Sequence, residues 1–455
     1  MKPVIQVLRS QGFLSVIYLD DILLIAKSEQ FCRLIVAKTR TLLESLGFVL
    51  NLEKSNFMPS QQCRFLGLDF NSKNFTVELP RERRDNILKL AKRFGSKSRC
   101  RIRDFAQCIG VLVSACQGVK YGWLYTKIVE SHKYLALLKT KGNFDGLMEI
   151  SKHVKTELEW WSENILSVNN PIRFSIYQLE IFSDASLSGW GAFCNGEKTH
   201  GWWNTEKQKE FINLLELRAA FNGLRCFAEN HRSCQILLRI DNTTAISYIN
   251  RMGGVQSIKL NSLARLIWQW CEKRNLWIFA SYIKSKDNSI TDSDSRILPP
   301  ETEWEMNQGI FVSIQKKFGR FDIDLFATNI NKNFQKFISW FKDPESMAVD
   351  AFIVSWSTFF FYAFPPFSLI LKVLRKISED RAEGVLVVPL WPTQAWYPLF
   401  LELLVDKPLQ FGPQIDLLTC PFWKVHPLAN NLILVVGSLS GKDFEEAEFQ
   451  MPLYH

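Results

Sequence analysis

Apolar and polar residues follow two different periods in the first part of the chain. Over residues 31–48, apolar positions recur every three or four residues and run up to Gly47, which predicts a helix that ends there. Residues 63–70 (CRFLGLDF) and 75–80 (FTVELP) alternate like a pair of strands. We therefore expect short strands and one helix up to about residue 80, followed by a mostly helical, basic segment up to about residue 170. Its clearest helices are RERRDNILKLAKRF and SKSRCRIRDFAQCIG.

Strands and helices alternate in the next part of the chain. The expected strands are 181–194, 235–241 and 276–283, and the expected helices are 211–229, 243–250 and 257–274. Paired prolines in LPPETEW indicate a linker at 298–304. The part that follows again mixes strands and helices, and no pattern is evident beyond Thr419. We predict a multidomain α/β and α+β chain, divided into 1–80, 81–173, 174–298, 305–417 and a tail at 418–455.

The longest apolar run, residues 351–371, is nearly long enough to cross a bilayer. Pro365 and Pro366 interrupt it, and several Ser and Thr residues are scattered along it. A buried strand, a turn at the prolines and a helix fit this pattern better, so we expect no membrane span.

Composition narrows the class of protein. The chain has 455 residues, of which 47% are hydrophobic and 22% charged, as in globular proteins. Its net charge of +9 is compatible with a polyanionic partner. The 15 Trp and 35 Phe residues suit either core packing or stacking on bases, and the counts leave both open. The 10 cysteines form no CxxC motif and no signal peptide is evident, which predicts an intracellular location, cytoplasmic, nuclear or both.

Two adjacent acids, Asp20 and Asp21, stand between apolar runs in VIYLDDILLIAKS. Neighbouring carboxylates repel each other unless a cation compensates them or they face water. If the two acids form the tip of a hairpin that binds Mg²⁺, the metal ion compensates their charge. If they form an ordinary exposed turn, both acids face water. The pattern alone leaves these two interpretations open.

Four further acids lie at positions where an acid needs an explanation. Asp184 falls inside an expected strand and Glu216 in an apolar helical run, while Asp241 lies at a strand end and Asp292 at an expected helix start. Taken singly, each acid has a structural explanation, such as a cap, a turn or a surface position. Together they can meet at one edge of a mixed sheet. Such a cluster favours two Mg²⁺ ions, the arrangement that supports phosphodiester cleavage.

These motifs resemble those of retroelement reverse transcriptases. The order SDAS, LLELRAA, RIDNTTAISYIN and ASYIKSKDNSITDSDSR resembles a ribonuclease H domain, YLDD resembles the polymerase motif, and residues 64–80 resemble the strands that lead into the thumb. The resemblance implies that Asp20 and Asp21 are polymerase metal ligands with Tyr18 beside the primer end. It also implies ribonuclease H carboxylates at Asp184, Glu216, Asp241 and Asp292. Mg²⁺, with Mn²⁺ as an alternative, and an RNA–DNA hybrid would be the cofactor and partner.

The sequence departs from this family in several places. The Gly usual before Asn288 is replaced within KSKDN, and the histidine that some ribonucleases H place on a loop near the site has no match. Two further departures concern the metal ligands. The usual ending ADxLSR reads TDSDSR here, which leaves the choice between Asp292 and Asp294 open. The family's palm carries a further Asp on a strand well before the YLDD hairpin, but the 17 residues before Tyr18 contain no acid. The resemblance therefore implies that this chain alone does not polymerise DNA.

The C-terminal segment resembles the adenine-methyltransferase-like domain of DIRS-type retrotransposons. In amino-methyltransferases an Asn or Asp precedes Pro-Pro-aromatic and holds the target amine, but this chain has Phe364-Pro365-Pro366-Phe367. Asp324 would mark the old cofactor strand, although DLFATN lacks a glycine-rich turn. The motif is degenerate, and we do not expect S-adenosylmethionine binding or methylation.

The favoured interpretation is a piece of a DIRS-type polyprotein with the end of the palm, a helical thumb or connection, ribonuclease H and the methyltransferase-like domain. Its expected activity is endonucleolytic, Mg²⁺-dependent hydrolysis of RNA in an RNA–DNA hybrid, with the basic helices of residues 81–103 along the hybrid backbone. The alternatives are a non-catalytic nucleic-acid-binding relic of a retroelement and a methyltransferase with an upstream scaffold.

Overall fold

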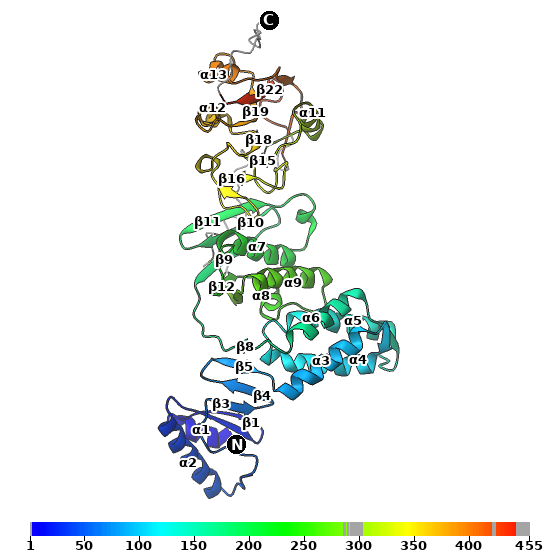
Figure 1. The fold of residues 1–455 in the computed structure, drawn as a ribbon, viewed down its shortest axis with the longest axis vertical. Helices are drawn as coiled ribbons and strands as arrows, with labels where there is room; N and C mark the ends of the chain where they lie inside the picture. Colours follow the sequence, from blue (N-terminus) through cyan, green and yellow to red (C-terminus); the bar gives the residue numbers. More distant parts are fainter. Residues whose placement is uncertain (1, 285–287, 289–290, 292–303, 421–424, 443–455) are drawn as a thin grey trace. The chain divides into compact units, whose positions relative to one another are not determined.

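The computed structural model describes residues 2–284, 288, 291, 304–420 and 425–442 (Figure 1). Contacts between Cα atoms divide the chain into two units. The first consists of Met1–Ile176 with Arg251–Asn261, and the second of Tyr177–Asn250 with Ser262–His455.

The first unit begins with a hairpin flanked by two helices. Its elements are α1 (Lys2–Ser10), β1 (Leu14–Tyr18), β2 (Asp21–Ile25) and α2 (Glu29–Ser45). The Ser28 side chain accepts a hydrogen bond from Phe31 N–H and caps α2, and Gly47 follows with φ +81°, so the predicted helix and its end are confirmed. The helix α1 was not expected. It packs Val4, Ile5 and Leu8 into a small core with α2, and nine residues are too few for a clear periodic pattern.

A four-stranded sheet follows in the order β3-β4-β5-β8, where two strands were predicted. The bounds are β3 Gln62–Phe65, β4 Leu68–Asn71, β5 Thr76–Glu78 and β8 Asn170–Pro171. The segment CRFLGLDF is a hairpin because Leu66 and Gly67 both take positive φ, 51° and 72°, and reverse the chain.

The basic region is mostly helical, as predicted. Its helices are α3 (Arg81–Gly95), α4 (Ile102–Ala115), α5 (Lys127–Lys139) and α6 (Lys152–Asn164), with single 3₁₀ turns at Cys116–Gly118 and Leu124–Thr126. The expected helix SKSRCRIRDFAQCIG is wrong for its first part. Arg99–Arg101 form the strand β6, which pairs with β7 (Leu147–Glu149), so α4 starts only at Ile102.

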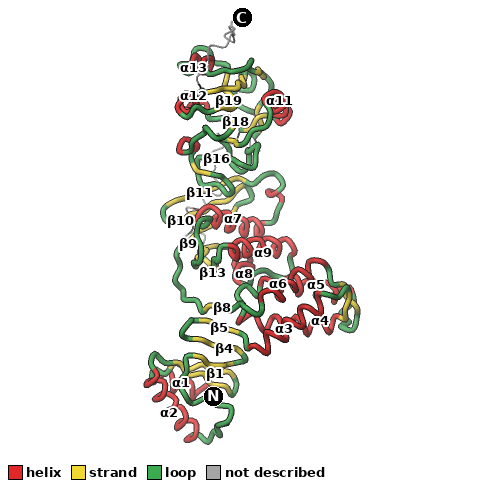
Figure 2. The backbone as a smooth tube through the Cα atoms, in the orientation of Figure 1, coloured by secondary structure: helices red, strands yellow, loops and turns green. Residues whose placement is uncertain are grey.

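The second unit contains a five-stranded mixed sheet in the order β11-β10-β9-β12-β13 (strands labelled between Figure 1 and Figure 2). The strands are β9 (Leu179–Ala185), β10 (Gly189–Cys194), β11 (Glu197–Trp202), β12 (Gln235–Ile240) and β13 (Trp277–Tyr282). The helices are α7 (Ile212–Phe227), α8 (Thr243–Asn250) and α9 (Ile258–Lys273), of which the first four residues, up to Asn261, belong to the first unit. Strands β9, β10 and β11 are antiparallel, whereas β9, β12 and β13 are parallel.

Two predictions for this sheet need correction. Residues 181–194 are not one strand, because the chain turns after Ala185 and returns as β10. The edge strand β11 was missed, since its sequence, EKTHGW, is too polar to show the alternation of a half-buried strand.

The C-terminal part of the second unit is built on another five-stranded sheet, ordered β15-β18-β19-β22-β20. These strands are β15 (Ile323–Asp324), β18 (Phe360–Ala363), β19 (Glu383–Pro389), β22 (Leu434–Ser440) and β20 (Leu409–Phe411). Its helices are α11 (Gln308–Phe318), α12 (Ile370–Glu379) and α13 (Tyr397–Glu402). Two short pairs are β14 (Glu305–Met306) with β21 (Leu418–Thr419) and β16 (Ile338–Ser339) with β17 (Ala348–Val349).

The expectation of an unpatterned tail after Thr419 is wrong for Leu434–Ser440. These residues form β22, which pairs with β19 on one side and β20 on the other. A strand buried on both faces has no alternation of apolar and polar residues, so periodicity did not identify it.

The long apolar run holds the expected strand, turn and helix. Residues 360–363 form β18, the two prolines follow it, and α12 starts at Ile370. Among the described residues, no helix is long and apolar enough to span a bilayer.

Candidate metal centre

Asp184 and Asp241 are brought together by neighbouring parallel strands. Asp184 lies in β9, at the centre of the sheet, and is 3% exposed. Phe182 of β9 is in register with Arg239 of β12, so Asp241, two residues further on, leaves β12 at the level of Asp184. Because adjacent strands are about 4.8 Å apart, this register places the two carboxylates side by side.

Glu216 comes from α7, which packs against β9 and β10. It stands among buried leucines and is 4% exposed. The helix approaches the sheet closely at Gly223, where an added Cβ would lie 3.1 Å from Ile181 Cγ2 and 3.2 Å from Ala192 Cβ. Burial of the apolar side of α7 therefore holds Glu216 near the ends of β9 and β12.

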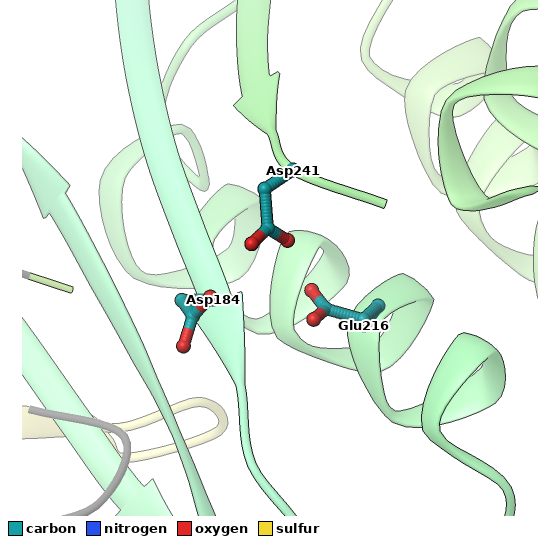
Figure 3. Close-up of side chains that lie close together, drawn as sticks. All are labelled: Asp184, Glu216 and Asp241. Atoms are coloured by element: carbon teal, nitrogen blue, oxygen red, sulfur yellow. The ribbon is translucent and has the colours of Figure 1, made fainter. Parts of the chain in front are cut away.

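The three carboxylates converge on one point. One ligand oxygen from each of Asp184, Glu216 and Asp241 lies within 4.8 Å of the others, and Figure 3 shows the three side chains turned toward one another. No second group of this kind occurs in the part of the chain that the structure describes. Two carboxylates at this separation repel by about 3 kcal/mol at an effective dielectric constant of about 20. Three oxygen ligands of this kind fit a hard divalent cation such as Mg²⁺ or Mn²⁺.

Amide side chains that the sequence analysis missed lie next to these acids. Asn242 follows Asp241 directly, and its Nδ2 donates to Asn213 Oδ1 at 2.8 Å, three residues before Glu216 in α7. Asn288 Nδ2 donates to the backbone oxygen of Ser183, beside Asp184, at 3.2 Å. The signal in the sequence was weak, because Asn242 also accepts from Ala245 N–H and looks like an ordinary helix cap. Asp292 and Asp294 lie outside the described residues.

The YLDD motif forms the tip of the β1–β2 hairpin, as the sequence predicted. Tyr18 pairs with Asp21, and Leu19 takes φ 53° at the turn. Both acids are exposed, and Tyr18 is 58% exposed. No third acid joins Asp20 and Asp21 in a metal-ligand group among the described residues.

Comparison with known protein families gives a match for the N-terminal part of the chain, which contains the YLDD hairpin. Residues 1–70 match the model of the reverse transcriptase (RNA-dependent DNA polymerase) family. The N-terminal 70 residues thus match the reverse transcriptase family, and a mixed sheet with an acidic triad follows them in the chain. No relative was found among curated protein sequences.

Solved structures with some similarity are of two kinds. The foamy viral protease-reverse transcriptase in complex with RNA/DNA hybrid is 15% identical, with a TM-score of 0.34, over 67% of this chain and 41% of that one. Ribonuclease H1 from Halobacterium salinarum is 11% identical, with a TM-score of 0.22, over 26% of this chain and 92% of that one. LC11-RNase H1 in complex with RNA/DNA hybrid is 14% identical, with a TM-score of 0.23, over 26% and 93%. The chain spans less than half the length of the foamy viral protein in its hybrid complex.

The cationic side chains of the basic helices after residue 80 are of two kinds, those that hold the fold together and those that face solvent. Arg84 is 9% exposed and donates to the backbone oxygens of Leu79, Ile165 and Leu166, so it fastens α3 to the end of α6. Arg99 pairs with Glu149 and Arg103 with Asp145, each at 3.0 Å.

Four other cations of α3 are exposed: Arg81 at its start and, further along, the group Lys89, Lys92 and Arg93. The members of this group are three and four residues apart and share one face of the helix. This group of cations, unlike Arg84, faces solvent.

Asp324 in the C-terminal sheet is buried and accepts hydrogen bonds from the loop that follows it. It is 2% exposed and accepts hydrogen bonds from Asn333 N–H at 3.2 Å and Phe326 N–H at 3.4 Å. Burial raises the pKa of this carboxyl to about 7, although the two backbone donors lower it. Phe364 and Phe367 of the FPPF segment have ring centroids 6.4 Å apart, and both pack against the buried core of this sheet.

Proposed function

We propose that the chain is part of a DIRS-type retroelement polyprotein and that it hydrolyses the RNA strand of RNA–DNA hybrids inside the cell. The observation that supports this most is the convergence of three carboxylates within 4.8 Å from β9, α7 and the end of β12. Two of them are buried, where acids are rare unless they are paired or bind a cation. The match of residues 1–70 to the reverse transcriptase family supports the same assignment.

Each residue has a separate role in this proposal. Asp184 and Asp241, on adjacent strands, would hold the metal ions, and Glu216 would position one ion and the attacking water from the helix side. Asp292 completes the ligand set. When bound, divalent ions lower the pKa of a water molecule and stabilise the leaving oxygen of the phosphodiester. The reaction is endonucleolytic, and the exposed face of α3 binds the hybrid backbone.

Polymerase and methyltransferase activities are not part of the proposal. The YLDD hairpin has no third acid beside it among the described residues. In the C-terminal part, Asp324 already accepts two backbone hydrogen bonds, and FPPF offers no side chain that can hold an amine. We propose that this part is a degenerate methyltransferase-like domain that does not bind S-adenosylmethionine.

The test is cleavage of an end-labelled RNA–DNA hybrid by the full chain with Mg²⁺, compared with Asp241→Asn. We expect the variant to lose activity by about 100-fold or more, because even groups that only orient a metal ligand are worth about 10–100-fold. Asp20→Asn is the matched control, since Asp20 is an exposed acid of the other unit and should leave the rate unchanged.

The alternative function is a non-catalytic retroelement relic that still binds nucleic acid. Hybrid binding without cleavage in both wild type and Asp241→Asn would favour it. Activity that survives in Asp241→Asn would refute the triad as the catalytic site.

A further inference from the structure

The first turn of α7 leads to Glu216, and apolar burial does little to hold it. Phe211, at the N-cap, makes no side-chain capping hydrogen bond to the described part of the chain. Phe211 and Ile212 are 42% and 40% exposed, and burial of leucines begins only at Leu214. Because the first N–H groups of a helix have no partner within it, this turn depends on contacts with other elements.

Asn213 supplies such a contact. Its Oδ1 accepts a hydrogen bond from Asn242 Nδ2 at 2.8 Å, and both side chains are half-buried. Asn242 is the residue directly after Asp241, so this bond joins α7 to the end of β12. Since residues three apart on a helix share a face, Asn213 and Glu216 are both directed toward that strand end.

Asn242 is held in a defined orientation by a second element. Its Oδ1 accepts from Ala245 N–H at 2.9 Å, and its backbone oxygen accepts from Ile246 N–H at 3.1 Å, both in the first turn of α8. The amide oxygen is therefore used by α8 and the amide nitrogen by α7. One side chain thus links α7 to the β12–α8 junction on the side where Glu216 and Asp241 meet.

This link acts against the repulsion between the carboxylates of the triad. Glu216 and Asp241 lie within 4.8 Å of each other and of Asp184, so their charges favour separation of α7 from the end of β12. The amide–amide hydrogen bond is neutral, and it opposes this separation without adding a charge that competes for a cation. Ligands that are already in place bind more tightly, because less free energy is spent on ordering them.

We propose that Asn213 and Asn242 are positioning residues that hold Glu216 beside Asp241, so that the triad is preorganised for a divalent cation. The inference rests on the proposed function, since it takes the triad as the metal site. The two amides act through the carboxylates and contact neither the cation nor the substrate. Without their hydrogen bond the first turn of α7 moves away from Asp241, and the cation binds more weakly.

The experiment is a Mn²⁺ titration of the full chain without nucleic acid, with free Mn²⁺ measured by electron paramagnetic resonance. The binding that Asp184→Asn abolishes defines the triad site. We expect Asn213→Ala to raise the Kd of this site about tenfold, within the range of about 10–100-fold for groups that orient metal ligands. Ala favours a helix more than Asn does, so this variant keeps α7.

A second variant and a control separate positioning from stability. Asn242→Ser keeps a side-chain oxygen for Ala245 N–H but has no amide donor, so we expect the same rise in Kd. The double variant Asn213→Ala/Asn242→Ser should bind Mn²⁺ no more weakly than either single variant, because both remove one shared hydrogen bond. In the control Asn250→Ala, at the other end of α8, two hydrogen bonds with the backbone of Ala280 are lost. Its thermal midpoint should fall and its Mn²⁺ Kd should stay unchanged.

The outcomes distinguish this inference from the proposed function. If the wild type has no Mn²⁺ site that Asp184→Asn abolishes, both are refuted. If that site is present and its Kd is unchanged in Asn213→Ala and Asn242→Ser, the inference alone is overturned. A higher KM for the hybrid in these variants at the wild-type Mn²⁺ Kd also overturns it, because the amides would then contact the substrate.

Discussion

The three carboxylates of the triad repel one another, and a bound cation would offset this repulsion. Because a ligand that binds only the folded state stabilises it, Mg²⁺ should stabilise the folded state by about 2.7 kcal/mol at 100 times its Kd. We expect Mg²⁺ to raise the thermal midpoint of the wild type, EDTA to reverse the rise, and Asp184→Asn to abolish most of it. Differential scanning calorimetry measures this. An equal Mg²⁺ shift in Asp184→Asn would show that the ions bind elsewhere.

Asp324 should make stability depend on pH. Its pKa rises from 3.8 to about 7 on folding, so the folded chain binds the proton more tightly and stability falls as pH rises through this interval. The loss between pH 5 and pH 8 is roughly 3 kcal/mol. Asp324→Asn, which is neutral throughout, should therefore gain stability over the wild type at pH 8 relative to pH 5. Urea unfolding at the two pH values checks this, with exposed Asp416→Asn as a control that should leave the pH dependence unchanged.

Two members of the triad were predictable because each acid interrupts an apolar pattern that is otherwise regular, whereas Asp241 was expected only at a strand end. Asp184 stands in a strand and Glu216 in a leucine-rich helix, so burial was the anomaly that marked them. Asn213, Asn242 and Asn288 carry no such mark, since amides are common in caps and turns. Asp292 stays a prediction because it lies outside the described residues.

Among the elements, α7 determines where Glu216 lies. Gly223 allows the close approach of α7 to Ile181 and Ala192, so Gly223→Val should push the helix away from the sheet. We expect a loss of about 1–3 kcal/mol in unfolding free energy and a lower cleavage rate. Gly110→Ala in α4, where an added Cβ meets nothing within 4 Å, should instead gain up to about 1 kcal/mol. Wild-type cleavage by Gly223→Val would mean that the site tolerates movement of α7.

Elements with a clear period were predictable, and those defined by tertiary pairing were not. The helices α2, α7 and α9 follow apolar spacings and appear within a few residues of their expected bounds. By contrast, β22 is identified only by its partners β19 and β20. The turn at Leu66, which divides residues 63–70 into two strands, was not predictable either, because a positive φ at a leucine has no sequence signal.

For the whole molecule, the net charge of +9 can act on an anionic partner only through cations that are not already used inside the fold. Many arginines of the first unit are committed to carbonyls or carboxylates, as Arg84, Arg99 and Arg103 show. The exposed face of α3 with Lys89, Lys92 and Arg93 is available to phosphate. In the proposed function, substrate binding and catalysis therefore fall to different units, and kinetic measurements can separate them.

The double variant Lys89→Ala/Lys92→Ala should raise KM for the hybrid and leave kcat close to wild type, because it removes binding that is equal in ground and transition states. Each lost phosphate contact lowers the slope of log affinity against log salt by about 0.9, so a decrease of about 2 is expected. Lys316→Ala/Arg320→Ala removes two exposed cations from the other unit and should change neither value. Hybrid cleavage and fluorescence anisotropy at several KCl concentrations measure both. An unchanged salt slope in the α3 variant, with KM at the wild-type value, would place the hybrid on another surface.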